Sequence, residues 1–371
     1  MSSLVKRTDP QSTAPIMMLS AGNGFILQSD KYSRDNAGQS LKKYILLKKG
    51  EIAYNHGASK AKQYGCCYEL HEEEARIPYV YHCFKINDEE YTPYVALELN
   101  NSKMDKQLKR LVSSSVRMDG LLNISFDDYM SIKITLPCIS EQRKISTFLK
   151  TLDKRIEKQR TLVEALKKYK RGLLSQLIAQ KKSFGVCGKW KTVKLGQVFK
   201  ERTERANGNE TLLAVTISNG VQRRGEIELK DNSSNDKSNY KRVYIGDIAY
   251  NTMRMWQGAS GASSYNGIVS PAYTIITPIC SDKQNIVFWA YYFKHIPLIQ
   301  TFQKFSQGLT SDTWNLKFPQ FSEIAVSLPP KQDQDQIAKC LSIFDGLCKN
   351  ERDKLQLLLQ IRTSLLQHLF I

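Results

Sequence analysis

The sequence predicts an α+β protein in which two domains, each a mixed sheet with short helices, are separated by two long antiparallel helices that form a coiled coil. Three observations predict this: a length of 371 residues, a long internal repeat, and a 3.5-residue spacing of apolar positions inside each repeat copy. We place the domains at residues 1–135 and 183–327, and the helices at 136–182 and 328–371.

The composition is that of an ordinary cytoplasmic protein. Hydrophobic residues make up 41% and charged residues 24%, and no apolar run approaches the ~18 residues of a membrane helix. The polar N-terminus lacks the apolar region of a secretory signal. The eight cysteines are scattered without zinc-ligand spacing, so we expect reduced thiols and no metal. Cys66 and Cys67 would point to opposite faces of a strand.

The repeat fixes the order of the elements along the chain. Leu136-Pro137 aligns with Leu328-Pro329, and the same offset of 192 residues aligns Gln142 with Gln334 and continues without a gap to the end of the chain. Such a register over more than 40 residues indicates duplication of a helical segment together with the domain that precedes it.

Within each copy, apolar positions alternate four and three residues apart, as in the seam of a coiled coil. The seam residues are Ile145, Leu149, Leu152, Ile156, Val163, Leu166, Leu173 and Leu177 in the first helix, and Ile337, Leu341, Phe344, Leu355, Leu358, Leu365 and Leu369 in the second. Each helix should be about 60 Å long, which argues against a pair buried inside one domain. One antiparallel register would place Lys170 opposite Glu351 and Gln159 opposite Arg362.

The segments ahead of the helices also match each other. Gly50-Glu51-Ile52-Ala53-Tyr54-Asn55 corresponds to Gly246-Asp247-Ile248-Ala249-Tyr250-Asn251, and short runs rich in Tyr, Val, Ile and Thr predict strands in both domains. The second domain opens with KWKTVKLGQV, whereas the counterpart of Leu195 in the first half would fall before residue 1. We therefore expect the first domain to be N-terminally shortened.

The net charge of +18 is unevenly distributed, because residues 141–182 hold 13 basic and 4 acidic residues. A surplus of Lys and Arg most often answers phosphate, which predicts nucleic-acid binding. The basic helix could face DNA or an acidic partner surface, and a solvated Lys-rich face is the simpler alternative.

Several segments resemble a known family. LPCISEQRKISTFLKTLDKRIEKQRTLVEALKKYKRGLLSQL, GDIAYNTMRMWQGASG, NGIVSPAY and KWKTVKLGQV are similar to segments of the specificity subunit of type I restriction-modification enzymes. The resemblance implies that each domain is a target-recognition domain for one half of a split double-stranded DNA sequence. It also implies that the helices set the spacing and dock two methyltransferase subunits, which motor-nuclease subunits join.

The same resemblance implies a chain without an active site. S-adenosylmethionine, ATP and Mg would belong to partner subunits, and the assembled complex would be a type I site-specific deoxyribonuclease and adenine-specific DNA methyltransferase. The residues agree, since no GxxxxGK[ST] loop, glycine-rich cofactor fingerprint or Asn/Asp-Pro-Pro-Tyr/Phe motif is present. Glu228-x-Lys230 alone is weak support for a stand-alone metal-dependent nuclease. A DNA- or RNA-binding scaffold is the other alternative.

We place the candidate DNA contacts in polar and basic loops beside the two Tyr-Asn strand ends and in other Gly/Ser-rich stretches. They are Asn55, His56, Ser59, Lys60, Lys62, Arg117, Arg223, Arg224, Asn251, Arg254, Trp256, Gln257, Gln307, Thr310 and Ser311. Exposure alone explains Lys60 and Lys62 almost as well, and Trp256 could be a core residue. Tyr54 and Tyr250 we interpret as packing residues.

Overall fold

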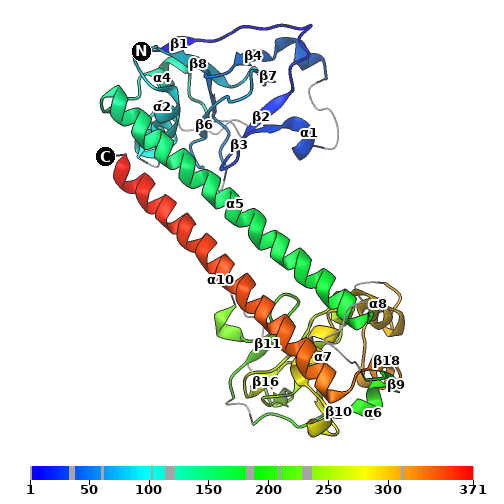
Figure 1. The fold of residues 1–371 in the computed structure, drawn as a ribbon. Coiled ribbons are helices and arrows are strands. Elements are labelled where there is room, and N and C mark those ends of the chain that lie inside the picture. The colour runs from blue at the N-terminus through cyan, green and yellow to red at the C-terminus, as the bar shows by residue number, and fades with distance from the viewer. Residues whose placement is uncertain are drawn as a thin grey trace. The chain divides into compact units, whose positions relative to one another are not determined.

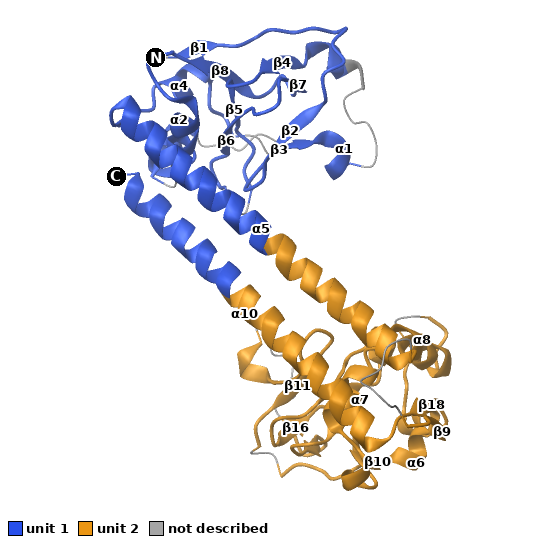
Figure 2. Ribbon diagram, in the orientation of Figure 1, with its two compact units in different colours: residues 1–159, 354–371 blue, residues 160–353 orange. Residues whose placement is uncertain are grey.

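The chain forms two compact units, which Figure 2 shows in different colours. Unit 1 comprises residues 1–159 and 354–371, and unit 2 comprises residues 160–353. Each unit therefore contains one α+β domain together with a segment of each long helix. The computed structural model describes residues 2–32, 38–59, 62–101, 103–112, 122–180, 188–207, 210–227, 236–310 and 313–370.

Unit 1 is built on a four-stranded antiparallel sheet in the order β1-β8-β5-β6 (Figure 1). The elements of its domain are β1 (Ser2–Leu4), β2 (Met17–Ser20), β3 (Gly24–Leu27), α1 (Gln28–Lys31), η1 (Gly38–Lys43), β4 (Ile45–Lys48), β5 (Ile52–Asn55), β6 (Cys66–Glu69), β7 (Glu74–Ile77), β8 (His82–Ile86), α2 (Thr92–Leu99), α3 (Met104–Leu111) and α4 (Phe126–Met130). Strands β2 and β3 form one two-stranded sheet, and β4 and β7 form another.

The central sheet of unit 1 is covered on both faces. Ile52 and Tyr54 of β5 pack into one core cluster, while Ala53 packs into the other. On β6, Cys66 lies in the cluster of Ala53 and Cys67 in the cluster of Tyr54, which confirms that the adjacent cysteines point to opposite faces. Strand alternation with two buried faces explains why the Ile-Ala-Tyr run is apolar throughout.

Unit 2 repeats this sheet in the order β10-β17-β14-β15, again fully antiparallel. The elements of its domain are β9 (Lys191–Lys194), α6 (Leu195–Val198), β10 (Phe199–Arg202), β11 (Leu213–Thr216), β12 (Gly220–Arg223), η2 (Arg224–Glu226), β13 (Lys241–Val243), β14 (Ile248–Asn251), η3 (Met255–Gln257), β15 (Ser260–Ala262), β16 (Gly267–Val269), β17 (Tyr273–Pro278), η4 (Ser281–Lys283), α7 (Ile286–Tyr292), α8 (Ile296–Phe305), α9 (Phe318–Ser322) and β18 (Ala325–Leu328). Strand β9, which precedes the four-stranded sheet in the sequence, pairs with β18, which follows it.

The two long helices are α5 (Ile139–Ile178) and α10 (Lys331–Leu369), with 40 and 39 residues. At 1.5 Å per residue each is about 60 Å long. The predicted fold class, α+β domains with two long helices, is confirmed. Every predicted seam residue of both helices is buried or half-buried. No helix in the described ranges combines the length and apolar composition needed to cross a bilayer.

In each unit, the segments of α5 and α10 run antiparallel, and an ion pair joins them. The Lys170 ammonium lies 2.5 Å from Asp345 in unit 2, and Arg362 pairs with Asp153 in unit 1. The register expected from the sequence is wrong, because both cations pair six residues earlier on the opposing helix. Lys170 and Arg362 are equivalent in the repeat, as are Asp153 and Asp345, so the duplication produces the same contact twice.

The packing of the helix ends on the domains explains this register. In unit 1, Leu149 packs with Tyr94 and Phe370, and in unit 2 Leu177 shares a core with Leu341. A seam of apolar residues every 3.5 positions is compatible with several alignments, so the domain contacts select among them.

A buried glutamine joins each domain to its helix. In unit 1 the Gln142 side chain accepts from the Tyr91 amide at 2.9 Å and donates to the carbonyl of Pro137 at 2.8 Å. In unit 2 Gln334 accepts from the Asn285 amide at 2.8 Å and donates to the proline carbonyl five residues before it at 3.0 Å. Both glutamines are 1% exposed. The repeated Leu-Pro and Gln positions are therefore one structural unit, which closes the domain onto the helix.

Candidate nucleic-acid interface

The acidic residue of the repeated Gly-Asp/Glu-Ile-Ala-Tyr-Asn motif closes a turn in both units. Glu51 accepts two hydrogen bonds from Arg7 at 2.6 and 2.7 Å, and Asp247 accepts two from Arg202 at 2.8 and 3.0 Å. Each carboxylate also accepts from the backbone amide three residues earlier. The glycine before each acid has a φ of 80° or 89°, which favours glycine. This part of the motif is structural, and it orients the strand that follows.

The asparagine that ends each motif starts a loop. The Asn55 side-chain oxygen accepts from the amide two residues later at 2.9 Å, and Asn251 does the same at 3.0 Å. Such turns let Asn replace a backbone hydrogen bond. The next residue is buried in both units: His56 is 5% and Thr252 is 7% exposed, and the carbonyl of each accepts from a leucine amide at 2.9 Å.

Three of the predicted DNA contacts therefore have local roles. Asn55 and Asn251 use their side-chain oxygens to build the loop. The His56 ring lies inside the domain, 5.0 Å from the His82 ring. A contact between DNA and any of these three stays a prediction, and the burial of His56 argues against it. Tyr54 and Tyr250, interpreted as packing residues, are 1% and 0% exposed.

In unit 2 the loop over residues 252–258 is held rigidly and presents polar side chains. Met255 is fully buried and anchors it. Gly258 has a φ of 80°, and a Cβ there would lie 3.1 Å from the Ile299 side chain. Arg254, just before Met255, and Gln257, just before Gly258, are exposed. Two predicted DNA contacts are thus displayed to solvent on a loop with little freedom.

Trp256 joins this loop to a second one. Its indole nitrogen donates to the Met253 carbonyl at 3.0 Å, and its ring meets Trp314 edge to face at 5.1 Å. Backbone hydrogen bonds of 3.0 and 2.8 Å close the base of the second loop at Gln307. Gln307 and Thr310 are exposed on this second loop, which the Trp256–Trp314 contact joins to the loop of Arg254 and Gln257. Trp256 is half-buried and holds the two loops together.

A third segment, the turn between β11 and β12, adjoins the loop over 252–258. The Lys294 ammonium donates to the carbonyls of Ile217 in the turn, at 2.9 Å, and of Gly258 in the loop. Next to this turn, Gly220 of β12 and Gly261 of β15 let these two strands approach, since a Cβ on Gly261 would lie 2.6 Å from the Gly220 Cα. Sequence reasoning missed Lys294, which no motif indicated.

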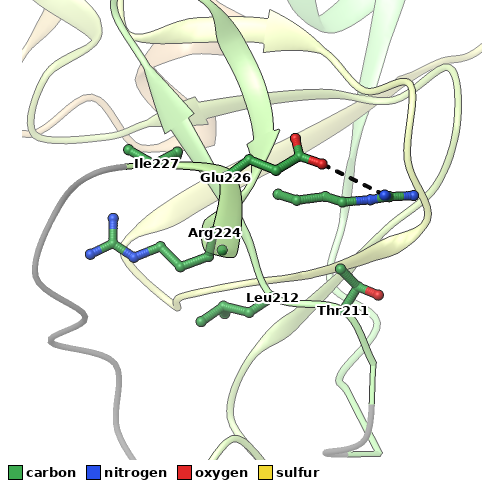
Figure 3. A pocket seen from close by; sticks show the side chains of 7 residues that line it. Thr211, Leu212, Arg224, Glu226 and Ile227 are labelled. Atoms are coloured by element: carbon green, nitrogen blue, oxygen red, sulfur yellow. Dashed lines mark ion pairs between the residues drawn. The ribbon is translucent and has the colours of Figure 1, made fainter.

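Arg223 and Arg224 lie at the opposite end of the β11–β12 hairpin, about 10 Å along the strands from that turn. They line a surface pocket of about 480 Å³ with Thr211, Leu212 and Glu226, which Figure 3 shows. Arg223 pairs with Glu226 at 3.6 Å and stacks over the Tyr265 ring. The structure therefore does not bring these two arginines to the group around Arg254.

In unit 1 the loop after β5 is built differently. Ser59 is exposed, and its hydroxyl accepts from the Lys62 amide at 3.1 Å. The Lys62 side chain is turned inward, and its ammonium lies 2.5 Å from the Asn100 carbonyl oxygen. Lys62 was predicted to meet DNA, but the structure uses its charge inside the domain. The predicted contacts Lys60, Arg117 and Ser311 lie outside the described residues, as does the Glu228-x-Lys230 motif.

The long helices add two kinds of exposed surface. Exposed cations of α5 are Arg143, Lys144, Lys150, Lys154, Arg155 and Lys158 in unit 1, and Arg160, Lys168 and Arg171 in unit 2. Helix α10 exposes apolar side chains four residues apart, Ile343 and Leu347 in unit 2 and Leu357 and Ile361 in unit 1, each between 41% and 57% exposed. The seam pattern did not predict these exposed apolar residues, because they lie between the seam positions.

In the ranges that the structure covers, no three His, Cys, Asp or Glu side chains gather as a metal site. The features that stand out are instead two copies of one sheet, a loop after the same strand in each, and two long helices. Together these define a duplicated architecture of two α+β domains, each with an exposed loop after the same strand, joined by long helices.

Comparison of the sequence with known protein families identifies the family of this chain. Residues 34–167 and 188–360 match the type I restriction modification DNA specificity domain. The chain belongs to this family and is a specificity subunit of a type I restriction-modification system, a non-catalytic kind of subunit.

Solved structures share the fold. The chain is similar to the HsdS subunit from Thermoanaerobacter tengcongensis (TM-score 0.50, 12% identity, 99% of this chain and 93% of that one). It is also similar to the type I S subunit from M. genitalium (TM-score 0.54, 14% identity, 100% and 93%). A third similar chain comes from a study of complex assembly and conformational transition of the type I system (TM-score 0.56, 13% identity, 99% and 94%).

Proposed function

We propose that the chain selects the target of a type I restriction-modification complex by binding double-stranded DNA in two separated halves, one half per unit. The duplication carries this proposal: the same sheet, the same acidic turn and the same Asn-initiated loop occur in both units. The loops differ in sequence between the units, which is what two different half-sites require.

In unit 2 the exposed side chains of Arg254, Gln257, Gln307 and Thr310 supply the donors and acceptors that base edges and phosphates need. Arg254 suits guanine or phosphate, and Gln257 suits adenine. In the described residues, no hydrogen bond or ion pair engages the Arg254 guanidinium, so it is available for such a contact. In unit 1, Ser59 occupies the corresponding loop.

The helices support the second part of the proposal, the docking of two methyltransferase subunits. The exposed apolar pairs of α10 offer one such pair in each unit, with the spacing of a helix-packing face. The cations of α5 provide charge for DNA or for an acidic subunit surface. Motor-nuclease subunits would join through the methyltransferases.

Catalysis belongs to those partners in this proposal. S-adenosylmethionine, ATP and Mg would bind to the methyltransferase and motor-nuclease subunits, and the assembled complex would act in the cytoplasm as an adenine-specific methyltransferase and site-specific deoxyribonuclease. The chain contributes recognition and spacing.

The test is co-expression of this chain with a type I methyltransferase subunit, followed by methylome sequencing of hosts with and without the chain. We expect a complex of two methyltransferase subunits with one copy of this chain, and adenine methylation at one DNA motif that consists of two separated halves. Methylation by the partner without this chain would contradict the proposal. Magnesium-dependent cleavage by the purified chain would favour a nuclease instead, and RNA competing as well as duplex DNA would favour a scaffold.

A further inference from the structure

Lys294 occupies an unusual position for a lysine in unit 2. It lies between α7 and α8, and its ammonium donates to the carbonyls of Ile217 and Gly258, on the two neighbouring loops. Desolvation, and to a lesser degree the nearby Lys170 charge, lowers its pKa to about 8. Removing a charged ammonium from water costs free energy unless hydrogen bonds replace those to water. Here the two carbonyl oxygens accept such hydrogen bonds from Lys294.

Lys62 makes the corresponding connection in unit 1. Its ammonium reaches from the loop after β5 to the Asn100 carbonyl, just beyond α2. The amides at the start of α2 and α7 bind Gln142 and Gln334 in the same way, and this alignment places Asn100 at the position of Lys294. The two units therefore connect the same two places, with the lysine at opposite ends.

We infer that Lys294 and Lys62 are positioning residues for sequence discrimination. Each holds the loop that follows the Ile-Ala-Tyr-Asn strand against the turn that follows α2 in unit 1 or α7 in unit 2. The inference rests on the proposed function for what the loops bind. Recognition residues must be held within about 0.5 Å of their working geometry. In unit 2, Met255 anchors the middle of the loop, and Lys294 fixes its end at the Gly258 carbonyl.

The recurrence with reversed polarity is the central observation. The sequence repeat does not align the two lysines, since the partner of Lys294 is Asn100 and Lys62 lies in the loop itself. A contact inherited from the duplication would keep its donor in place, as the Gln142 and Gln334 contacts do. The connection between loop and turn is thus retained in both units while its chemistry is rebuilt.

The first experiment measures the tether without reference to DNA. Hydrogen exchange on the full chain compares Lys294→Met and Lys294→Arg with Lys304→Met, a substitution of an exposed lysine on α8. We expect Lys294→Met to raise exchange of the amides at 216–219 and 252–258 by about tenfold, as local opening becomes easier. Lys294→Arg keeps donors for both carbonyls and should restore most of the protection. Unchanged exchange in Lys294→Met would overturn the inference.

The second experiment measures discrimination in the assembled modification complex by methylome sequencing. Lys294→Met should lower the preference for the intact motif over single mismatches about tenfold in one half of the motif only, comparable to losing one base contact. Lys62→Met should relax the other half, with Lys109→Met, on the exposed face of α3, as its control. A uniform loss of methylation with unchanged preference would show a purely structural role and would overturn the inference.

The two experiments separate this inference from the proposed function. If the unaltered chain directs no methylation, the proposed function fails, and the exchange data still decide whether the lysines hold the loops. If the unaltered chain directs methylation at a split motif and both methionine variants keep full discrimination, only the positioning role is lost.

Discussion

Units 1 and 2 each contain a four-stranded sheet of the same arrangement, but different elements cover the two sheets. In unit 2, β9 and α6 precede the common sheet, and Leu195 and Val198 of α6 are 0% and 5% exposed in its core. In unit 1, where β1 is the counterpart of β10, residues 133–136 align in the repeat with β18 and form no strand. The elements common to both units are those that close turns, begin loops and join the helices, so these define the recognition scaffold, whereas the covering elements vary.

Side-chain size reflects this difference. A Cβ on Gly196 of α6 would lie 2.8 Å from the Ser322 side chain, so the two elements touch closely in unit 2. The repeat places Met130 at the position of Ser322, and its sulfur lies 3.2 Å from the Ser2 hydroxyl. A larger residue thus stands in unit 1 at the position that contacts α6 in unit 2.

The largest expected effect comes from Leu195→Ala, which removes a fully buried side chain of α6 from the core of unit 2. Removing a fully buried leucine should cost about 2–5 kcal/mol of unfolding free energy through lost burial and the remaining cavity. All four tryptophans lie in unit 2, so tryptophan fluorescence during urea unfolding reports this unit alone. Leu309→Ala, at a fully exposed position of unit 2, is the control, and equal shifts in both variants would contradict the prediction.

Arg254→Ala tests whether the exposed loop of unit 2 recognises its own half-site. Losing a contact to a base edge should cost about 1–3 kcal/mol of discrimination at one base pair, with the other half of the motif unchanged. Methylome sequencing of the complex measures both halves at once. Weakening that is equal at all sequences would instead assign Arg254 to a phosphate.

Charge reversal across the helices tests the equivalence of the two ion pairs. Lys170→Glu and Arg362→Glu should each lower stability by about 0.5–1 kcal/mol, because these pairs are partly exposed and screened. Lys170→Glu should cost more, since Lys170 also lies 4.7 Å above the Tyr291 ring. Adding Asp345→Lys or Asp153→Arg should restore stability in double-mutant cycles. Rescue of Lys170→Glu by Glu351→Lys instead would support the other register.

The smallest effect is a pH dependence that both units share. Burial lowers the pKa of His82 in unit 1 and of His295 in unit 2 from the ordinary value of 6.5. Below that pH the unfolded chain takes up protons that the folded chain does not, so stability falls as pH drops below about 6.5. Urea midpoints between pH 8 and 5 measure this. His82→Gln should flatten the profile of unit 1 only, and an unchanged slope would contradict the assignment.

Local patterns predicted much of the fold. The seam spacing indicated both long helices, and the Ile-Ala-Tyr-Asn runs indicated two equivalent central strands, because period and apolarity are local properties of the chain. The candidate DNA contacts stay predictions, and the structure shows only where their side chains lie. Arg254, Gln257, Gln307 and Thr310 are exposed on adjacent loops, whereas His56 is buried and Lys62 bonds inside its domain. A polar residue in a loop has the same local signature in either case.

The amino-acid sequence by itself determined the duplication, the lengths of the helices and the strand after which each loop begins, since these depend on residues close together along the chain. Tertiary structure alone decided the helix register and the inward turn of Lys62 and Lys294. Those choices depend on which carbonyls, carboxylates and apolar side chains distant segments bring within about 3 Å of one another, and packing, not sequence spacing, sets that.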